Sequence, residues 1–252
     1  MENKKILITG GASGIGLAMV TLFAERKSEV FFIDNREDIG KEVEKSLRLK
    51  GLNVHFLHSD LTDSKRVNQA VNSISGSLDV LINNAGISHI GKVESTDEDD
   101  FDRLYEVNIK GAFIATKAAL SKIKENGGGS ILNMASVAAT MGLPDRFAYS
   151  MTKGAILSMT LSIARDYVAE GIRCNCISPG RVHTPFVDGF LAKNYPGQEN
   201  EMFQKLAATQ PIGRMADPKE IAALAYFISS EEGSFMTGVD YKIDGGFTGL
   251  KM

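Results

Sequence analysis

The chain has 252 residues, of which 43% are hydrophobic and 23% charged, and its formal net charge at pH 7 is −3. This slightly acidic balance lacks the excess of basic residues that is typical of proteins that bind nucleic acids or anionic membrane surfaces. No apolar run approaches the roughly 20 residues that cross a bilayer, and residues 1–5 lack the apolar region of a signal peptide. We therefore expect a cytoplasmic protein without membrane or nucleic-acid partners, whose two cysteines, Cys174 and Cys176, are free thiols.

Short β-rich apolar runs alternate with longer segments of helical periodicity along the whole chain. The runs predict strands at residues 5–9, 30–34, 53–58, 80–83, 130–134, 172–178 and 239–243. The segments between them predict helices at about 14–27, 37–50, 64–75, 98–126, 147–169 and 217–230. Several runs are continuously apolar, which is typical of strands buried on both faces. The alternation predicts an α/β fold in which helices flank a doubly wound, parallel, seven-stranded sheet.

The sequence shows no linker, repeat or break in charge composition, so we expect a single domain over residues 1–252. The three glycines at 127–129 are the strongest candidate boundary, but glycine is also typical of a helix end. Residues 181–212 contain no predicted strand and include the Thr184-Pro185 step. A segment of that length predicts short helices in a substrate lid or specificity loop.

A glycine-rich turn links the first predicted strand to the first predicted helix. It reads Thr9-Gly10-Gly11-Ala12-Ser13-Gly14-Ile15-Gly16, and such a turn lets the backbone approach a pyrophosphate and aim free N–H groups at it. Asp34 ends the second predicted strand, 18 residues after Gly16, where a carboxylate accepts the ribose hydroxyls of NAD and repels the 2′-phosphate of NADP. The alternatives are that Asp34 only begins a turn, or that Arg36 accommodates a 2′-phosphate. We expect a dinucleotide site that prefers NAD.

Three residues form a candidate site for proton transfer. Tyr149 and Lys153 stand four apart in a predicted helix and share a face, while Ser136 follows the carboxyl end of a strand, where open α/β sheets bind ligands. A phenol with an ordinary pKa of about 10 is a weak base at neutral pH. An adjacent ammonium and a positive nicotinamide lower that pKa, while Ser136 would orient the substrate oxygen. By spacing alone Tyr149 and Lys153 are more often a surface pair, so the assignment depends on the preceding glycine turn.

In their order along the chain, these motifs resemble those of the short-chain dehydrogenase/reductase family, and the resemblance covers nearly the whole sequence. The matching positions are Thr9 to Gly16, Asp60-Leu61, Asn83-Asn84-Ala85-Gly86, Asn108, Ser136, Tyr149 with Lys153, Pro179 to Thr184, and Asp244-Gly245-Gly246. The resemblance implies a Rossmann-type fold and hydride transfer between NAD and a secondary alcohol or ketone. It also implies a homo-oligomer, with a tetramer favoured.

The resemblance further implies roles for individual residues. Tyr149 accepts the hydroxyl proton during oxidation, and Lys153 binds the nicotinamide ribose. Asn108 holds a water that connects Lys153 to solvent, so that Asn108, Ser136, Tyr149 and Lys153 are the expected catalytic residues. The residues expected to bind the cofactor are Gly10, Ser13, Gly14, Ile15, Gly16, Asp34, Asp60, Leu61, Asn84, Gly86, Tyr149, Lys153, Pro179, Val182 and Thr184.

Polar residues near these motifs predict the substrate. Arg146 lies three residues before Tyr149, where its guanidinium either binds a carboxylate or is a solvated charge at a helix start. Arg181 and His183 lie in the predicted lid, and Ser88 follows a strand; each either lines the pocket or faces solvent. This set favours a small hydroxy acid or sugar acid, similar to the substrates of sugar-acid dehydrogenases in the family, with a free sugar or polyol second.

A metal site and a function without catalysis are the two remaining possibilities to consider. The four histidines have no metal-like spacing with carboxylates, so we expect no metal site. A dinucleotide-binding regulator that keeps the fold without turnover is the remaining alternative. The presence of all four expected catalytic residues favours an active enzyme.

Overall fold

Parallel strands form one sheet in the order β3-β2-β1-β4-β5-β6-β7 in the computed structural model, which describes residues 1–250. The order reverses at β1, which pairs with β2 on one side and with β4 on the other. The strands are β1 (Lys5–Thr9), β2 (Glu29–Asp34), β3 (Val54–His58), β4 (Val80–Asn83), β5 (Gly129–Met134), β6 (Ile172–Pro179) and β7 (Asp240–Ile243). The predicted α/β fold with a seven-stranded parallel sheet is confirmed.

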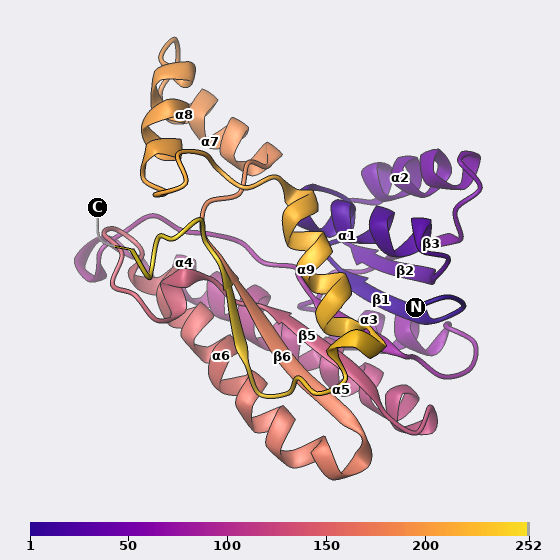
Figure 1. The fold of residues 1–252 in the computed structure, drawn as a ribbon. Coiled ribbons are helices and arrows are strands. Elements are labelled where there is room, and N and C mark those ends of the chain that lie inside the picture. Colours follow the sequence, from indigo (N-terminus) through magenta and orange to yellow (C-terminus); the bar gives the residue numbers. More distant parts are fainter. Residues whose placement is uncertain (251–252) are drawn as a thin grey trace.

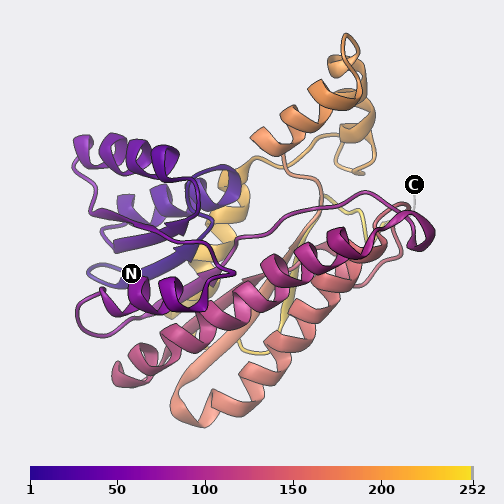
Figure 2. The same ribbon diagram turned by 180° about the vertical axis from the view of Figure 1, so that it is seen from behind.

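Helices cover both faces of the sheet (Figures 1 and 2). They are α1 (Gly14–Glu25), α2 (Glu37–Leu49), α3 (Ser64–Asn72), α4 (Glu98–Leu104), α5 (Gly111–Glu125), α6 (Phe147–Tyr167), α7 (Pro185–Asn194), α8 (Glu199–Ala208) and α9 (Pro218–Ser229). Helices α1, α2 and α9 lie on one face, and α3, α5 and α6 on the other. Helices α7 and α8 project away from the sheet in Figure 1 and occupy the segment for which the sequence predicts a lid.

Strand β1 shows how the two faces are filled. Ile6 and Ile8 are fully buried against α1 and α9, while Leu7 between them is fully buried against α3 and α5. Alternate side chains of a strand point to opposite faces, so a strand covered on both sides must be apolar throughout. Burial on both faces of the sheet therefore explains why the strand segments are continuously apolar in the sequence.

The long helix that the sequence predicts over 98–126 is interrupted. Helix α4 ends at Leu104, a π-helical turn follows over Tyr105–Lys110, and α5 begins at Gly111. A π turn inserts one extra residue into the helical repeat and is typical of functional positions. The predicted helical segment over 98–126 is confirmed, and neither proline nor a helix-ending motif in the sequence marks the π-helical turn within it.

The glycines at 127–129 end a helix and do not separate domains. Gly127 and Gly128 have φ values of +78° and +125°, and Gly129 is the first residue of β5. A Cβ on Gly128 would lie 2.4 Å from the carbonyl oxygen of Gly171, so this turn packs directly against the turn before β6. Glycine is needed because the backbone enters the left-handed region.

Cys174 and Cys176 are buried free thiols, as expected. Burial raises the pKa of both, that of Cys176 to about 12, so neither is a reactive thiolate at neutral pH. Among residues 1–250, none of the helices combines the length and the apolar character that crossing a bilayer requires.

Candidate active site

A cavity of about 920 Å³ lies at the carboxyl ends of the strands, between the sheet and helix α7. This is the edge at which an open parallel sheet binds ligands, next to the point where the strand order reverses. Every residue that the sequence assigns to the cofactor lines the cavity. These residues are Gly10, Ser13, Gly14, Ile15, Gly16, Asp34, Asp60, Leu61, Asn84, Gly86, Tyr149, Lys153, Pro179, Val182 and Thr184.

The glycine turn forms one wall of this cavity. Gly10 and Gly14 have φ values of +68° and +53°, which glycine adopts without strain. A Cβ on Gly16 would lie 2.0 Å from the carbonyl oxygen of Gly10, so a larger residue cannot occupy this position without displacing the turn. The Asn84 side chain fixes the turn by donating to the carbonyl oxygens of Thr9 (3.0 Å) and Gly10 (3.1 Å). The first N–H groups of α1 face the cavity without a side-chain cap, and this arrangement fits a pyrophosphate.

Asp34 lies at the end of β2 with its side chain 4% exposed. Its Oδ1 accepts from Arg36 Nε (2.9 Å), and its Oδ2 accepts from Arg36 Nη2 (3.0 Å) and the N–H of Ala12 (3.1 Å). Burial by itself would raise the pKa of the Asp34 carboxyl, but the hydrogen bonds from Arg36 and Ala12 outweigh it and hold the pKa below its ordinary value. Arg36 Nη2 also donates to Ser13 Oγ (2.9 Å), so the guanidinium bridges the acid to the glycine turn.

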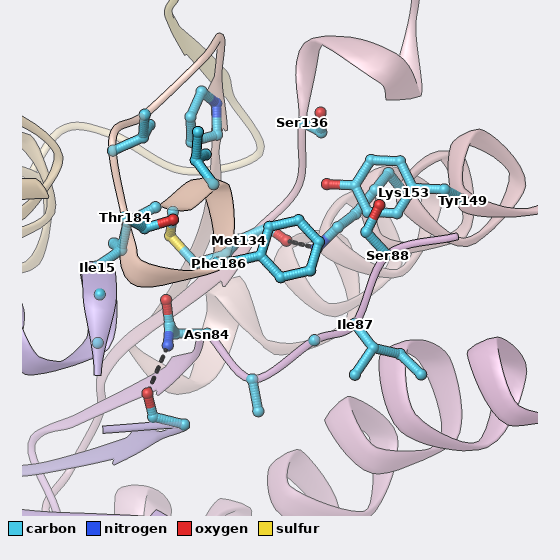
Figure 3. Close-up of a pocket in the computed structure, with 18 of the residues that line it drawn as sticks. Ile15, Asn84, Ile87, Ser88, Met134, Ser136, Tyr149, Lys153, Thr184 and Phe186 are labelled. Carbon is cyan, nitrogen blue, oxygen red and sulfur yellow. Dashed lines mark hydrogen bonds between the residues drawn. The ribbon is translucent and has the colours of Figure 1, made fainter. Parts of the chain in front are cut away.

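Ser136, Tyr149 and Lys153 meet at the other end of the cavity (Figure 3). Ser136 follows β5, and Tyr149 and Lys153 lie on the first turns of α6. Lys153 is 6% exposed, and its Nζ donates to the carbonyl oxygen of Met134 at 2.7 Å. The same Nζ lies 5.8 Å from the centre of the Tyr149 ring. The hydroxyl, the phenol and the ammonium thus surround one opening, although they come from segments far apart in the sequence.

The pKa of Tyr149 differs from the value that the sequence predicts. Burial raises the pKa of the Tyr149 phenol, and the hydrogen bond with Ser136 and the positive charge of Arg146 act in the lowering direction without overcoming it. Burial lowers the pKa of Lys153 to about 8. The ammonium is directed at a carbonyl and not at the phenol, so the protein's own residues do not produce the lowered Tyr149 pKa that the sequence predicts.

Asn108 lies on the π-helical turn and is 2% exposed. Its Oδ1 accepts the N–H of Ile87 (2.8 Å), and its Nδ2 donates to the carbonyl oxygen of Ile87 (2.9 Å) and to Thr152 Oγ1 (3.0 Å). The side chain lies behind the cavity wall, next to Gly86, and does not line the cavity itself. It supports the segment that carries Ile87 and Ser88, while its predicted contact with a water stays a prediction.

Three of the four predicted substrate residues line the cavity, namely Ser88, Arg146 and Arg181. Arg146 is the residue immediately before α6, and its Nη1 lies 3.4 Å from the carbonyl oxygen of His89. His183 does not line the cavity. Its Nε2 lies 2.8 Å from Asp188 Oδ1, and its ring packs edge-on against Phe203 beside a smaller pocket behind the lid.

The backbone explains why His183 departs from its neighbours. Val182 forms an isolated parallel β-bridge with Ala216, and the N–H of His183 donates to the Ala216 carbonyl (2.9 Å). In an extended segment alternate side chains point to opposite sides. Val182 and Thr184 line the cavity, and His183 is turned away from it.

Several lining residues were not predicted from the sequence. Leu143, Phe186, Leu206 and Phe247 supply apolar surface, and Thr209 and Gln210 supply polar groups from the end of the lid. These residues carry no motif, because they reach the cavity only through the packing of the loop before α6, the lid and the C-terminal segment. No cluster of potential metal ligands occurs among the residues that the structure describes.

A family model described as enoyl-(acyl carrier protein) reductase matches residues 10–248. The chain is 35% identical to 2-keto-3-deoxy-L-fuconate dehydrogenase of Xanthomonas campestris, a match that covers 98% of this chain and 81% of that protein. It is 33% identical to cyclopentanol dehydrogenase of Comamonas testosteroni, with 98% of both chains covered. The crystal structure of L-sorbose reductase from Gluconobacter frateurii, complexed with NADPH and L-sorbose, superposes with a TM-score of 0.95 at 28% identity and covers 100% of this chain and 98% of that one.

The fold and the cavity define a Rossmann-type protein that binds a nicotinamide dinucleotide. The chain belongs to the short-chain dehydrogenase/reductase family, whose members are oxidoreductases.

Proposed function

We propose that this protein is an NAD-dependent dehydrogenase that interconverts a secondary alcohol and a ketone on a small polar acid. The observation that carries the reaction class is the convergence of Ser136, Tyr149 and Lys153 at one end of a cavity whose other end is the glycine turn. A dinucleotide bound along the cavity would have its phosphates at the N-terminus of α1 and its reactive ring beside Tyr149.

Tyr149, Ser136 and Lys153 have separate roles in the proposed reaction. A nicotinamide held in this cavity would supply or accept the hydride. Tyr149 takes the hydroxyl proton during oxidation and returns it during reduction, while Ser136 donates to the substrate oxygen and orients it. Lys153, whose pKa burial lowers to about 8, holds the ribose and is able to exchange a proton near neutral pH. Burial raises the pKa of Tyr149 in the protein alone, and the positive charge of an oxidised cofactor would act in the lowering direction.

Asp34 supports NAD as the preferred cofactor. Its ionised carboxylate lies in the cavity, where it can accept two ribose hydroxyls and would repel a 2′-phosphate. Arg36 is the group that supports NADP, since a guanidinium beside the ribose can bind a phosphate. The bidentate pairing of Arg36 with Asp34 favours NAD, because the cation is already occupied.

Arg146 and Arg181 support an acid as the substrate. Both guanidinium groups line the cavity, and among residues 1–250 neither forms an ion pair with a carboxylate. A bidentate contact to a substrate carboxylate would neutralise this charge. The similarity to a keto-deoxy-fuconate dehydrogenase favours the same class, and the similarity to L-sorbose reductase supports a free sugar or polyol as the second candidate.

We also infer a cytoplasmic homotetramer. The outer faces of α5 and α6 expose large apolar side chains, among them Phe113 (53%) and Leu161 (49%). Apolar side chains gathered on exposed helix faces are typical of subunit interfaces. Sedimentation equilibrium on the wild type would give the mass of the assembly, and a monomer at micromolar concentration would contradict this part of the proposal.

The function is tested by following NADH absorbance with a panel of hydroxy acids, sugar acids, sugars and simple alcohols. We expect turnover of at least one acid with NAD, a lower rate with NADP, and a tenfold or greater loss of acid turnover in Arg146→Ala. If NADH binds but no member of the panel reacts, the remaining interpretation is a dinucleotide-binding regulator.

A further inference from the structure

The end of the lid holds Arg181 in place. Arg181 Nε donates to Thr209 Oγ1 at 3.0 Å, and the backbone N–H of Arg181 donates to Gln210 Oε1 at 3.2 Å. Thr209 and Gln210 are the residues that immediately follow α8, and both line the cavity. The side chain that enters the cavity and the backbone that carries it are therefore fixed by two consecutive lid residues.

Thr209 and Gln210 are themselves firmly placed. Gln210 is 3% exposed, and its Nε2 donates to Thr209 Oγ1 (3.1 Å), which in turn donates to the carbonyl oxygen of Leu206 (2.6 Å). A Cβ on Gly180 would lie 2.5 Å from Gln210 Oε1, so the Gln210 amide packs directly against the backbone after β6. The amide thus joins the end of the lid to the strand end that carries Arg181.

The charge of Arg181 has no acidic partner at this site. Arg146 lines the same cavity, and burial together with the positive charge of Arg146 lowers the pKa of the Arg181 guanidinium. Thr209 Oγ1 is a neutral acceptor and satisfies only one of the five donors of the guanidinium. Two guanidinium groups that line one cavity without a carboxylate partner are stabilised by an anion that binds there.

We propose that Thr209 and Gln210 are positioning residues that set the selectivity of this enzyme for anionic substrates by fixing Arg181 in the cavity that Arg146 also lines. This inference rests on the proposed function for the reaction but adds a separate claim about specificity. The ligand class is a ketone or alcohol that carries a carboxylate or a similar anion a few bonds from the reacting carbon. The position of the lid and the affinity for anions are then coupled, because Thr209 and Gln210 end the lid and also orient the Arg181 guanidinium.

The test compares an acid with its uncharged ester. The reduction of 2-oxobutanoate and of methyl 2-oxobutanoate by NADH is measured in the wild type, Thr209→Val and Thr209→Ser. Valine keeps the shape of threonine but removes the acceptor of Arg181 Nε, and a hydrogen bond to a charged group corresponds to about a tenfold change in affinity or more. We expect Thr209→Val to raise the KM for the acid about tenfold relative to the KM for the ester, with kcat much less affected, and Thr209→Ser to restore the wild-type ratio.

Thr21→Val is the matched control, because Thr21 Oγ1 makes the same kind of bond to the carbonyl oxygen one turn earlier (Leu17, 2.8 Å) and does not line the cavity. A parallel rise in KM for acid and ester in Thr209→Val would show that Thr209 only stabilises the lid and would overturn the proposal. An acid-to-ester ratio equal to that of the wild type would overturn it as well.

Failure of the reaction itself is separated from failure of this inference by a binding measurement. If the wild type reduces neither compound, malonate is titrated by calorimetry into the protein saturated with NADH. Malonate that binds the wild type and Thr209→Ser about tenfold more tightly than Arg181→Ala and Thr209→Val supports the positioning role. Equal binding to all four proteins, or no binding to any, overturns it whatever the reaction is.

Discussion

Asp34 and Arg36 form a bidentate ion pair at the end of β2, with Oδ1–Nε and Oδ2–Nη2 distances of 2.9 and 3.0 Å. The carboxylate is almost fully buried, whereas the guanidinium is about half exposed. The acid is therefore fixed and ionised, while one side of the arginine is open to solvent. From this asymmetry we expect Asp34 to determine the choice between NAD and NADP and Arg36 to act as its partner.

We predict that Asp34→Ser reverses the cofactor preference. Loss of the carboxylate removes two hydrogen bonds to a charged acceptor and frees Arg36 for a phosphate, so kcat/KM with NADH falls about 10- to 100-fold while kcat/KM with NADPH rises. Steady-state rates with both cofactors measure the effect. In Asp34→Ser/Arg36→Ala the gain with NADPH disappears, and an equal loss with both cofactors in the single variant would contradict the assignment of Asp34.

We predict that Tyr149→Phe lowers kcat by about 10³-fold, within the range of about 10²–10⁴ that general acid–base groups contribute. Only the hydroxyl is removed, and Lys153 and the glycine turn remain, so NADH binding, followed by the enhancement of NADH fluorescence, weakens far less than kcat. Tyr167→Phe is the control, since Tyr167 lies at the far end of the same helix with Lys124 over its ring. A Tyr149→Phe enzyme with more than a tenth of wild-type turnover would exclude the phenol as the proton carrier.

The fold and the motif residues follow from the sequence for a common reason. Apolar periodicity and glycine placement act locally, so the strands, the glycine turn and Asp34 are recognisable from short segments. The π turn at Asn108 has no such signal, because it depends on how this segment packs against α6. The contacts of Thr209 and Gln210 depend on where the lid returns to the sheet, and no local pattern encodes that return.

From the lowered pKa of Lys153 we predict how the free energy of unfolding depends on pH. Its folded-state pKa is about 8 against an ordinary value of 10.5, because burial disfavours the ammonium. Below about pH 8 Lys153 is charged in both the folded and the unfolded state, and the burial of its charge opposes folding in full. Between about pH 8 and 10.5 Lys153 keeps its proton in the unfolded chain but has lost it in the folded protein, so the free energy of unfolding rises with pH. Relative to Lys153→Met, the wild-type free energy of unfolding should rise by on the order of 3 kcal/mol from about pH 7 to about pH 10.5.

Urea unfolding of both proteins without cofactor, at intervals over this pH range, measures that difference. Other titrating groups are common to the two proteins and cancel, apart from those that contact Lys153 directly. A flat difference across the range would mean that the Lys153 amine keeps its ordinary pKa in the fold. A difference that falls with pH would mean that the site stabilises the ammonium, as a nearby anion does.

We predict that Asn108→Ala destabilises the protein by about 2–4 kcal/mol and lowers kcat, since the N–H and the carbonyl of Ile87 lose their partner next to the cavity. Chemical denaturation and steady-state kinetics give the two effects. Asn126→Ala is the control, because the Asn126 side chain also makes three hydrogen bonds but is exposed, and we expect its cost to be below about 1 kcal/mol. Equal costs for the two variants would show that the Ile87 backbone finds other partners.

We predict that Gly16→Ala abolishes cofactor binding by closing the turn. The added methyl group would lie 2.0 Å from the Gly10 carbonyl oxygen and 2.6 Å from Asn84 Nδ2, so either the turn opens or α1 shifts, and both displace the N–H groups that face the pyrophosphate. We expect NADH affinity to fall about 100-fold or more and the free energy of unfolding to fall by about 1–3 kcal/mol. Gly189→Ala is the matched control, since Gly189 lies within α7 with no atom near its Cβ position, and there alanine should stabilise the helix by about 0.5–1 kcal/mol. If Gly16→Ala bound NADH as tightly as the wild type, the turn would not be the pyrophosphate site, and the position of the cofactor in this cavity would have to be reassigned.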